Sequence, residues 1–172
     1  ILPTGIVAGD LLIIFAELGN TVSAGPLGWT QLFMLNPGII LTGYYKVAVG
    51  GDANPVITTG TVTRSSHISY RITGARGSVE AATNAVSLDP PNLAPSWGLE
   101  KTLWLVVGGD NSAAATPAPT NYTNLLQMAD SFDHNHISSA RRLLEVSSEN
   151  PDAFGGGQEF PVSATVAIQP AP

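Results

Sequence analysis

Short apolar runs alternate along the chain with clusters of Gly, Pro, Asn and Asp, a pattern typical of an all-β protein. Two of the runs, 11–15 and 103–107, are continuously apolar, so we expect strands there that are covered on both faces. In 66–73 the apolar residues alternate with polar ones, which indicates a strand with one buried face. The pattern predicts strands at 10–18, 29–35, 39–48, 56–63, 67–73, 103–107, 122–128, 137–146 and 162–168.

The second half of the chain repeats the pattern of the first. The run 10–20 returns at 101–111, and 28–30 returns at 121–123. The spacing between matching segments drifts only by loop-sized amounts. Two similar runs of strands at this spacing predict one antiparallel β-sandwich of two related halves.

A proline-rich segment, 89–98, separates the two halves. Proline cannot donate to a β-ladder and favours extended backbone, so we interpret this segment as a crossover. The expected organisation is a single jelly-roll-like sandwich domain over 1–172, with halves at about 1–88 and 99–172. A chain of 172 residues is long enough to bury a core of this kind.

The segment 138–146 permits two interpretations. Its Ala, Arg, Leu and Glu residues favour a helix that Ser138 could cap. Its counterpart in the first half, 39–48, is instead rich in β-branched and aromatic residues. We therefore favour a strand.

The composition favours a component of an assembly. Hydrophobic residues make up 44% of the chain and charged residues only 12%, so uncharged polar residues or neighbouring molecules must cover much of the surface. The net charge of −6 provides no basic footprint for a phosphate backbone, so we expect no nucleic-acid partner. The absence of cysteine excludes disulfides, thiolate metal sites and cysteine nucleophiles.

No apolar run approaches the roughly 20 residues that cross a bilayer, so we expect no membrane insertion. The sequence begins at Ile1 within what reads as continuing structure. We therefore expect a processed product or part of a longer polypeptide, with a strand upstream.

One polar segment, 130–136, contains a possible metal site. On an extended strand His134 and His136 would point the same way, and Asp130 or Asp133 could add a carboxylate ligand. The alternative is a polar loop between two strands, which we favour because no third ligand is fixed. We expect no cofactor.

Catalytic motifs are missing from the sequence. It contains no Gly-x-Ser-x-Gly elbow and no phosphate-binding glycine loop followed by a lysine. The glutamates are scattered, so they neither indicate nor exclude a glycosidase pair. His67 starts a predicted strand, where an edge histidine is the simplest interpretation. We expect a protein that is not an enzyme.

Aromatic residues are the remaining candidates for binding. Trp104 lies in an apolar run and is predicted to be in the core, whereas Trp97 in the crossover is the best candidate for exposure. An exposed Trp97 could stack on a sugar ring beside polar loop residues. Packing of Trp97 onto the sandwich is the alternative that we favour. The polar candidates beside it are Tyr122, Asn121, Asp110 and Asn111.

Several short motifs occur in the same order as in a recurrent domain of phage and prophage proteins. They include Gly9-Asp10, Gly28-Trp29, Tyr44-Tyr45-Lys46, Pro90-Pro91, Trp97-Gly98, Tyr122-Thr123, Ala140-Arg141 and Asn150-Pro151. Over nearly its whole length the chain resembles this domain, a virion structural module of jelly-roll type. The family pattern offers no catalytic residue.

The resemblance implies a capsid decoration or cement protein, or a module of a head fibre or tail fibre. The expected partners are the major capsid protein or other virion proteins and further copies of the chain as a homotrimer, all on the particle surface. Trp97 and Arg142 are candidates for that interface. The alternative is a tail-fibre module that binds a receptor or a host-surface glycan.

Overall fold

All regular structure in the described residues is β. A computed structural model describes residues 1–19, 22–61, 64–111, 117–130, 134–156 and 159–171. The strands are β1 (Leu11–Leu18), β2 (Val22–Ala24), β3 (Thr30–Leu35), β4 (Ile40–Val47), β5 (Thr58–Thr59), β6 (Ser65–Ile72), β7 (Ala75–Asn84), β8 (Glu100–Asp110), β9 (Thr123–Met128), β10 (His136–Val146) and β11 (Val162–Pro170).

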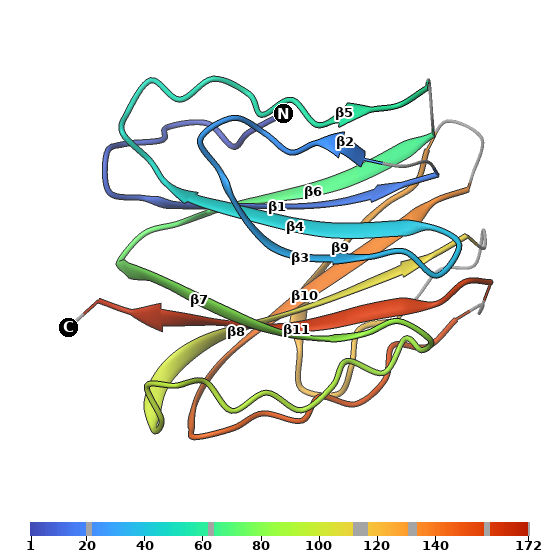
Figure 1. Ribbon diagram of the computed structural model, residues 1–172. Coiled ribbons are helices and arrows are strands. Elements are labelled where there is room, and N and C mark those ends of the chain that lie inside the picture. The colour runs from blue at the N-terminus through green and yellow to red at the C-terminus, as the bar shows by residue number, and fades with distance from the viewer. Residues whose placement is uncertain (20–21, 62–63, 112–116, 131–133, 157–158, 172) are drawn as a thin grey trace.

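Two antiparallel sheets pack face to face as a sandwich (Figure 1). The first sheet has the order β3-β4-β1-β6 and the second has the order β7-β11-β8-β10-β9. The short strands β2 and β5 pair with each other outside these sheets. The predicted antiparallel β-sandwich is confirmed.

The two halves of the sequence build sheets with the same strand order. We number the four strands of each half by their order in the chain and leave out β2, β5 and the edge strand β7. Across each sheet these strands then stand in the order second, third, first, fourth: β3-β4-β1-β6 in one sheet and β9-β10-β8-β11 in the other. This agreement supports the repeat seen in the sequence. Counted from the other edge this order is fourth, first, third, second, which differs from the fourth, first, second, third order of a Greek key.

The chain changes sheet between β6 and β7, at a turn around Gly74 (Figure 1). Strand β7 then joins the outer edge of the second sheet beside β11. The proline-rich segment 89–98 consequently connects two strands of one sheet, β7 and β8. The change of sheet therefore comes before residue 88, where the sequence places the end of the first half.

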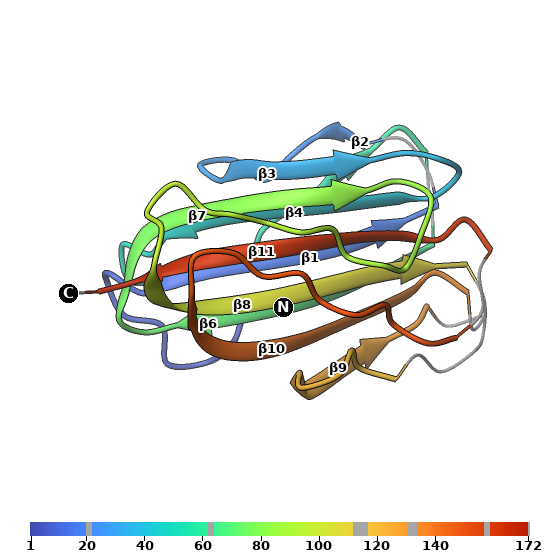
Figure 2. The ribbon, with the colours of Figure 1, turned by 90° about the horizontal axis from the view of Figure 1, so that it is seen from below.

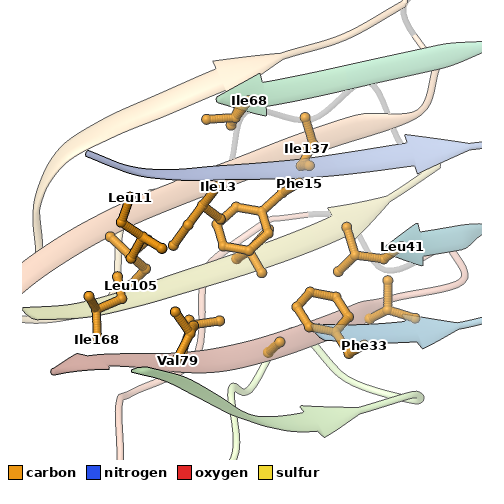
Figure 3. Close-up of a cluster of buried hydrophobic side chains, with 14 of the residues drawn as sticks. Leu11, Ile13, Phe15, Phe33, Leu41, Ile68, Val79, Leu105, Ile137 and Ile168 are labelled. Carbon is orange, nitrogen blue, oxygen red and sulfur yellow. The ribbon is translucent and has the colours of Figure 1, made fainter. Parts of the chain in front are cut away.

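The main core lies between the sheets (Figure 3). Inward-facing side chains of β1 and β8 meet there, with the rings of Phe15 and Phe33 stacked at a centroid distance of 6.0 Å. Every residue of β1 is buried, and residues 104–107 of β8 are fully buried. The two continuously apolar runs are thus covered on both faces, as predicted.

Loops cover the outer faces of both sheets. On the second sheet, Trp104 and Val106 lie beneath Leu88, Leu93 and Phe154, which come from the connections after β7 and β10. On the first sheet a smaller cluster joins Leu2, Leu12 and Ala48. This loop layer explains why the central strands lack a polar face.

Four elements differ from the predicted strands or decide between predicted alternatives, and the short strand β2 is one that the sequence does not predict. Strand β7 is not predicted, since its alternating positions carry Ala75, Gly77, Val79 and Ala81 and give little apolar signal. The predicted strand 56–63 is reduced to β5 within the described residues. The segment 138–146 is part of β10, so the preference for a strand over a helix is confirmed.

Candidate functional site

Trp97, Tyr122 and Arg142 lie on the covered outer face of the second sheet. The Trp97 ring packs against the cluster around Trp104, and its Nε1 donates to Oγ1 of Thr102 at 3.0 Å. Trp97 is half-buried. The favoured expectation that Trp97 packs onto the sandwich is confirmed, which leaves it poorly placed to stack on a sugar.

Tyr122 and Arg142 share one acceptor, the carboxylate of Glu149. The Tyr122 hydroxyl donates to Glu149 Oε1 at 3.3 Å, and Arg142 Nη1 donates to the same oxygen at 2.9 Å. Burial, together with the Glu149 charge, raises the pKa of Tyr122 above its usual range. The backbone of Glu149 exchanges two hydrogen bonds of 2.9 Å with Leu93 in the crossover. The trio therefore fastens the loop layer to the sheet.

The first half of the chain contains an ion pair that corresponds to the one between Arg142 and Glu149. It joins the equivalent strand of that half to the loop that follows. Lys46 near the end of β4 forms an ion pair of 2.6 Å with Asp52 in the following loop, as Arg142 of β10 does with Glu149. The hydrogen bond from Lys46 and the backbone N–H groups of Val49 and Gly50 hold the pKa of Asp52 below its usual range. Because both halves use a cation to tie down this loop, a structural role accounts for Arg142.

Asn121 is exposed and occupies a turn. Its φ of 66° is left-handed, and the Tyr122 N–H donates to the Pro119 carbonyl at 3.1 Å. The matching turn in the first half has Gly28 at this position with φ 77°. The local backbone therefore accounts for an asparagine here, since Asn tolerates the left-handed region better than most residues.

The polar loop candidates are not brought together. Thr102, which binds Trp97, and Asp110 lie near opposite ends of β8, about 26 Å apart at the usual strand rise. Asp110 is 3% exposed and stands opposite His136 in the strand pair. Asn111 bonds through its backbone N–H to Glu159. The predicted sugar platform, which needs these residues at one end, does not form.

His134 and His136 are not held on an extended segment. Asn135 between them has a φ of 48°, so the alternation that would aim both rings the same way is broken. Asp130 accepts the His134 backbone N–H at 2.9 Å, and Asp133 lies outside the described residues. Across the part of the chain that the structure describes, no group of three or more His, Asp or Glu is arranged to hold a metal ion.

Glu17 on β1 is the most unusual carboxyl in the sandwich. It is fully buried, and a hydrogen bond from the Asp110 backbone only partly offsets the cost of burying its charge. Burial raises its pKa to about 9, and the charges of Asp110 and Asp130 act in the same direction. A carboxyl that stays protonated at neutral pH is a structural acid here, because it does not face solvent or a groove.

A surface that the sequence does not reveal lies on the inner face of β9 and β10. Strand β9 forms the edge of the wider sheet, at the bottom of Figure 2. Leu126 and Met128 stand opposite Ser139 and Ile137 and share their inward face, yet they are 42% and 50% exposed. Leu143 on β10 is 57% exposed. Leu143 lies four residues along β10 from Ser139, roughly 13 Å away at the usual strand rise, so we call only Leu126 and Met128 the β9 face.

The β9 face belongs to an edge strand without charge. The sequence of β9, Thr-Asn-Leu-Leu-Gln-Met, contains no Lys, Arg, Asp, Glu or Pro. Monomeric proteins usually protect sheet edges with such residues, because unpaired backbone groups on an edge can pair with another chain. The edge and the apolar side chains beside it together form a surface suited to protein contact.

The fold and this surface define the structural class of the protein. It is an antiparallel β-sandwich with a loop-covered outer face and an apolar sheet edge. No protein-family model, curated protein or solved structure matches the chain. The described residues include no helix long and apolar enough to cross a membrane.

Proposed function

We propose that the protein is a non-enzymatic structural module of a phage virion. It decorates or cements the capsid, or forms part of a head fibre, through contacts with the major capsid protein and with copies of itself. The β9 face is the observation that supports this proposal most directly. Its apolar side chains stand on an edge strand that carries no charge to oppose pairing.

The phage placement rests on the motif order in the sequence, and the homotrimer rests on the same resemblance. The surface chemistry is compatible with both. Val86, Leu99 and Leu27 add scattered exposed apolar residues, whereas Leu126 and Met128 of the β9 face stand two residues apart on one edge strand. A gathered patch marks an interaction site more strongly than single residues do.

A tail-fibre module that binds a receptor or glycan is the alternative. It requires exposed aromatic side chains near polar loops. Trp97 and Tyr122 are engaged within the protein, the first with Thr102 and the second with Glu149. These contacts favour the structural proposal over the glycan-binding one.

The first experiment measures the mass of the purified chain by light scattering and its co-sedimentation with DNA-filled capsids of the encoding phage. We expect a trimer that sediments with capsids. Leu126→Lys should weaken capsid or self-association at least tenfold, because it places a charge on the β9 face. Leu27→Lys is the matched control, since Leu27 is fully exposed in a turn elsewhere.

A monomer that ignores capsids would contradict the proposal. Equal losses in both lysine variants would also contradict it, because the effect would then come from charge in general. Thermal unfolding of each variant establishes that the fold is intact.

A further inference from the structure

A cavity opens between the sheets at the end of the sandwich that carries the turn between β6 and β7. Its volume is about 380 Å³. Ile72 of the first sheet and Leu103, Leu143 and Ile168 of the second form apolar walls. Small-molecule sites in proteins are typically concave, mostly apolar spaces of roughly 300 to 1,000 Å³ with a few polar groups.

Two cationic residues stand at core-facing positions in this cavity. Lys101 lies two residues before Leu103 on β8, whose inward side chains continue into the main core. Arg141 lies four residues after the core residue Ile137 on β10. Side chains two or four residues apart on a strand share a face, so both cations lie on the inner face of the second sheet, at its solvent-exposed end.

Arg141 and Lys101 are also two of the three Lys and Arg residues that have no acidic partner among the described residues. Four of the seven Lys and Arg residues form ion pairs: Lys46 with Asp52, Arg64 with Asp130, Arg71 with Asp10 and Arg142 with Glu149. Lys101, Arg141 and Arg76 form none with any residue that the structure describes. Glu145 stands opposite Lys101 in the strand pair but makes no ion pair with it. Because the chain has a net charge of −6, acidic residues outnumber Lys and Arg, and cations without an acidic partner are therefore unexpected.

The guanidinium of Arg141 is held in place by a distorted part of β9. The register between β9 and β10 shifts between Ser139 and Arg141, and Asn124 in the distortion has a φ of 53°. In the amide orientation that satisfies both groups, the Asn124 oxygen accepts from Arg141 Nε at 2.9 Å and from Nη2 at 3.0 Å. Bulges of this kind commonly re-aim a side chain, and the bonds reduce the freedom that Arg141 would lose on binding.

We propose that this cavity binds a small carboxylic acid with an aliphatic body. The acid group meets Arg141, Lys101 adds a second positive charge to the same cavity, and the aliphatic chain lies against Ile72, Leu103, Leu143 and Ile168. Arginine and lysine supply the donors that a carboxylate requires, and apolar walls exclude water from the remainder of the ligand. This site is independent of the proposed virion role, since it needs neither capsid nor a second copy.

Octanoate is the probe, titrated into the purified full chain by isothermal calorimetry. We expect saturable binding with one site per chain and at least tenfold weaker binding for neutral octanamide. Arg141→Gln and Lys101→Gln should each weaken octanoate binding at least tenfold. Arg76→Gln is the matched control, because Arg76 is exposed, forms no ion pair with a described residue and does not line the cavity.

Three results would overturn the proposal. One is no saturable octanoate binding at millimolar concentration, and another is equal binding of octanamide. The third is an equal loss in Arg76→Gln, which would indicate general attraction to positive charge. If octanoate does not bind but Arg141→Gln changes the mass in light scattering, the cavity is a protein contact and the proposal fails. Circular dichroism of each variant separates these results from misfolding.

Discussion

The carboxyl group of Glu17 on β1 occupies the space that a side chain would fill at Gly109 on β8. A Cβ atom at Gly109 would lie 2.9 Å from Glu17 Oε2 and 3.0 Å from Cγ2 of Val162. The two sheets can therefore approach at this point because one strand has no side chain there. Glycine on β8 and a buried acid on β1 form a single packing unit across the sandwich.

Gly109→Ala should destabilise the protein by about 1 to 3 kcal/mol, since an added methyl group overpacks a site where Glu17 is fully buried. The measurement is urea unfolding followed by tryptophan fluorescence. Combining the change with Glu17→Ala should recover part of the loss, because the carboxyl group no longer competes for the space. Strict additivity of the two changes would show that the residues do not interact.

Glu17 should make the stability depend on pH. Its pKa is raised from 4.5 to about 9 in the folded protein. The proton is held more tightly in the folded state, so this contribution to stability is complete below pH 4.5 and is lost as the pH rises toward 9. Glu17→Gln should therefore flatten the pH profile of the unfolding free energy, with a difference of roughly 3 to 4 kcal/mol between pH 5 and pH 8.

The check is urea unfolding of wild type and Glu17→Gln across that range. Glutamine has nearly the same shape and carries no charge at any of these pH values. Parallel profiles for the two proteins would mean that Glu17 ionises normally in the folded state.

Arg142→Met should destabilise the protein by about 2 to 4 kcal/mol, because it leaves the Glu149 carboxylate, which is buried, with a tyrosine hydroxyl as its remaining partner. Arg76→Met, at an exposed position, should change stability by less than about 0.5 kcal/mol. Both are measured by urea unfolding. If both changes lowered the unfolding free energy by similarly small amounts, the proposed role of Arg142 in fastening the loop layer would be contradicted.

Asp10 should contribute to acid sensitivity. Its carboxylate accepts from the Val7 N–H at 2.9 Å and from Arg71 Nε at 2.6 Å, and these bonds hold its pKa below the ordinary value of 3.8. Its contribution is present above that ordinary value and is lost as the pH falls through the lower folded pKa. Asp10→Asn should lower stability at pH 7 and flatten the decline below about pH 4.

Acid unfolding followed by circular dichroism tests this expectation. Asp152→Asn is the control, because Asp152 is exposed in the loop after β10. An identical acid transition in wild type and Asp10→Asn would contradict the expectation.

The apolar pattern was sufficient to predict the sandwich and most of its strands, but it could not locate β7. In β7 the inward positions include Gly77, whose Cβ would lie 3.0 Å from Cγ2 of Val47 in β4. Small residues are needed here because the edges of the two sheets come close. That requirement comes from tertiary packing, and a period-two search for large apolar residues does not detect it.

The candidate surfaces were harder to predict than the fold. The packing of Trp97 could be anticipated, because the proline-rich segment runs over a sheet and a large apolar ring in it can be buried against that sheet. The exposure of Leu126 could not, because it depends on one sheet being wider than the other. The position of Arg141 in a cavity likewise depends on how the sheets separate at one end.

The single change of sheet at Gly74 means that the polypeptide is two complete ladders joined by one exposed turn. Strands β1, β3, β4 and β6 find all their sheet partners before this turn, and β7 to β11 find theirs after it. A protease that cut here would leave every strand in its ladder, and the core together with side-chain bonds between the sheets, such as Tyr70 to Ser139, would hold the two fragments together. The same sandwich could then be assembled from two separately produced chains, or from two copies that exchange one sheet each.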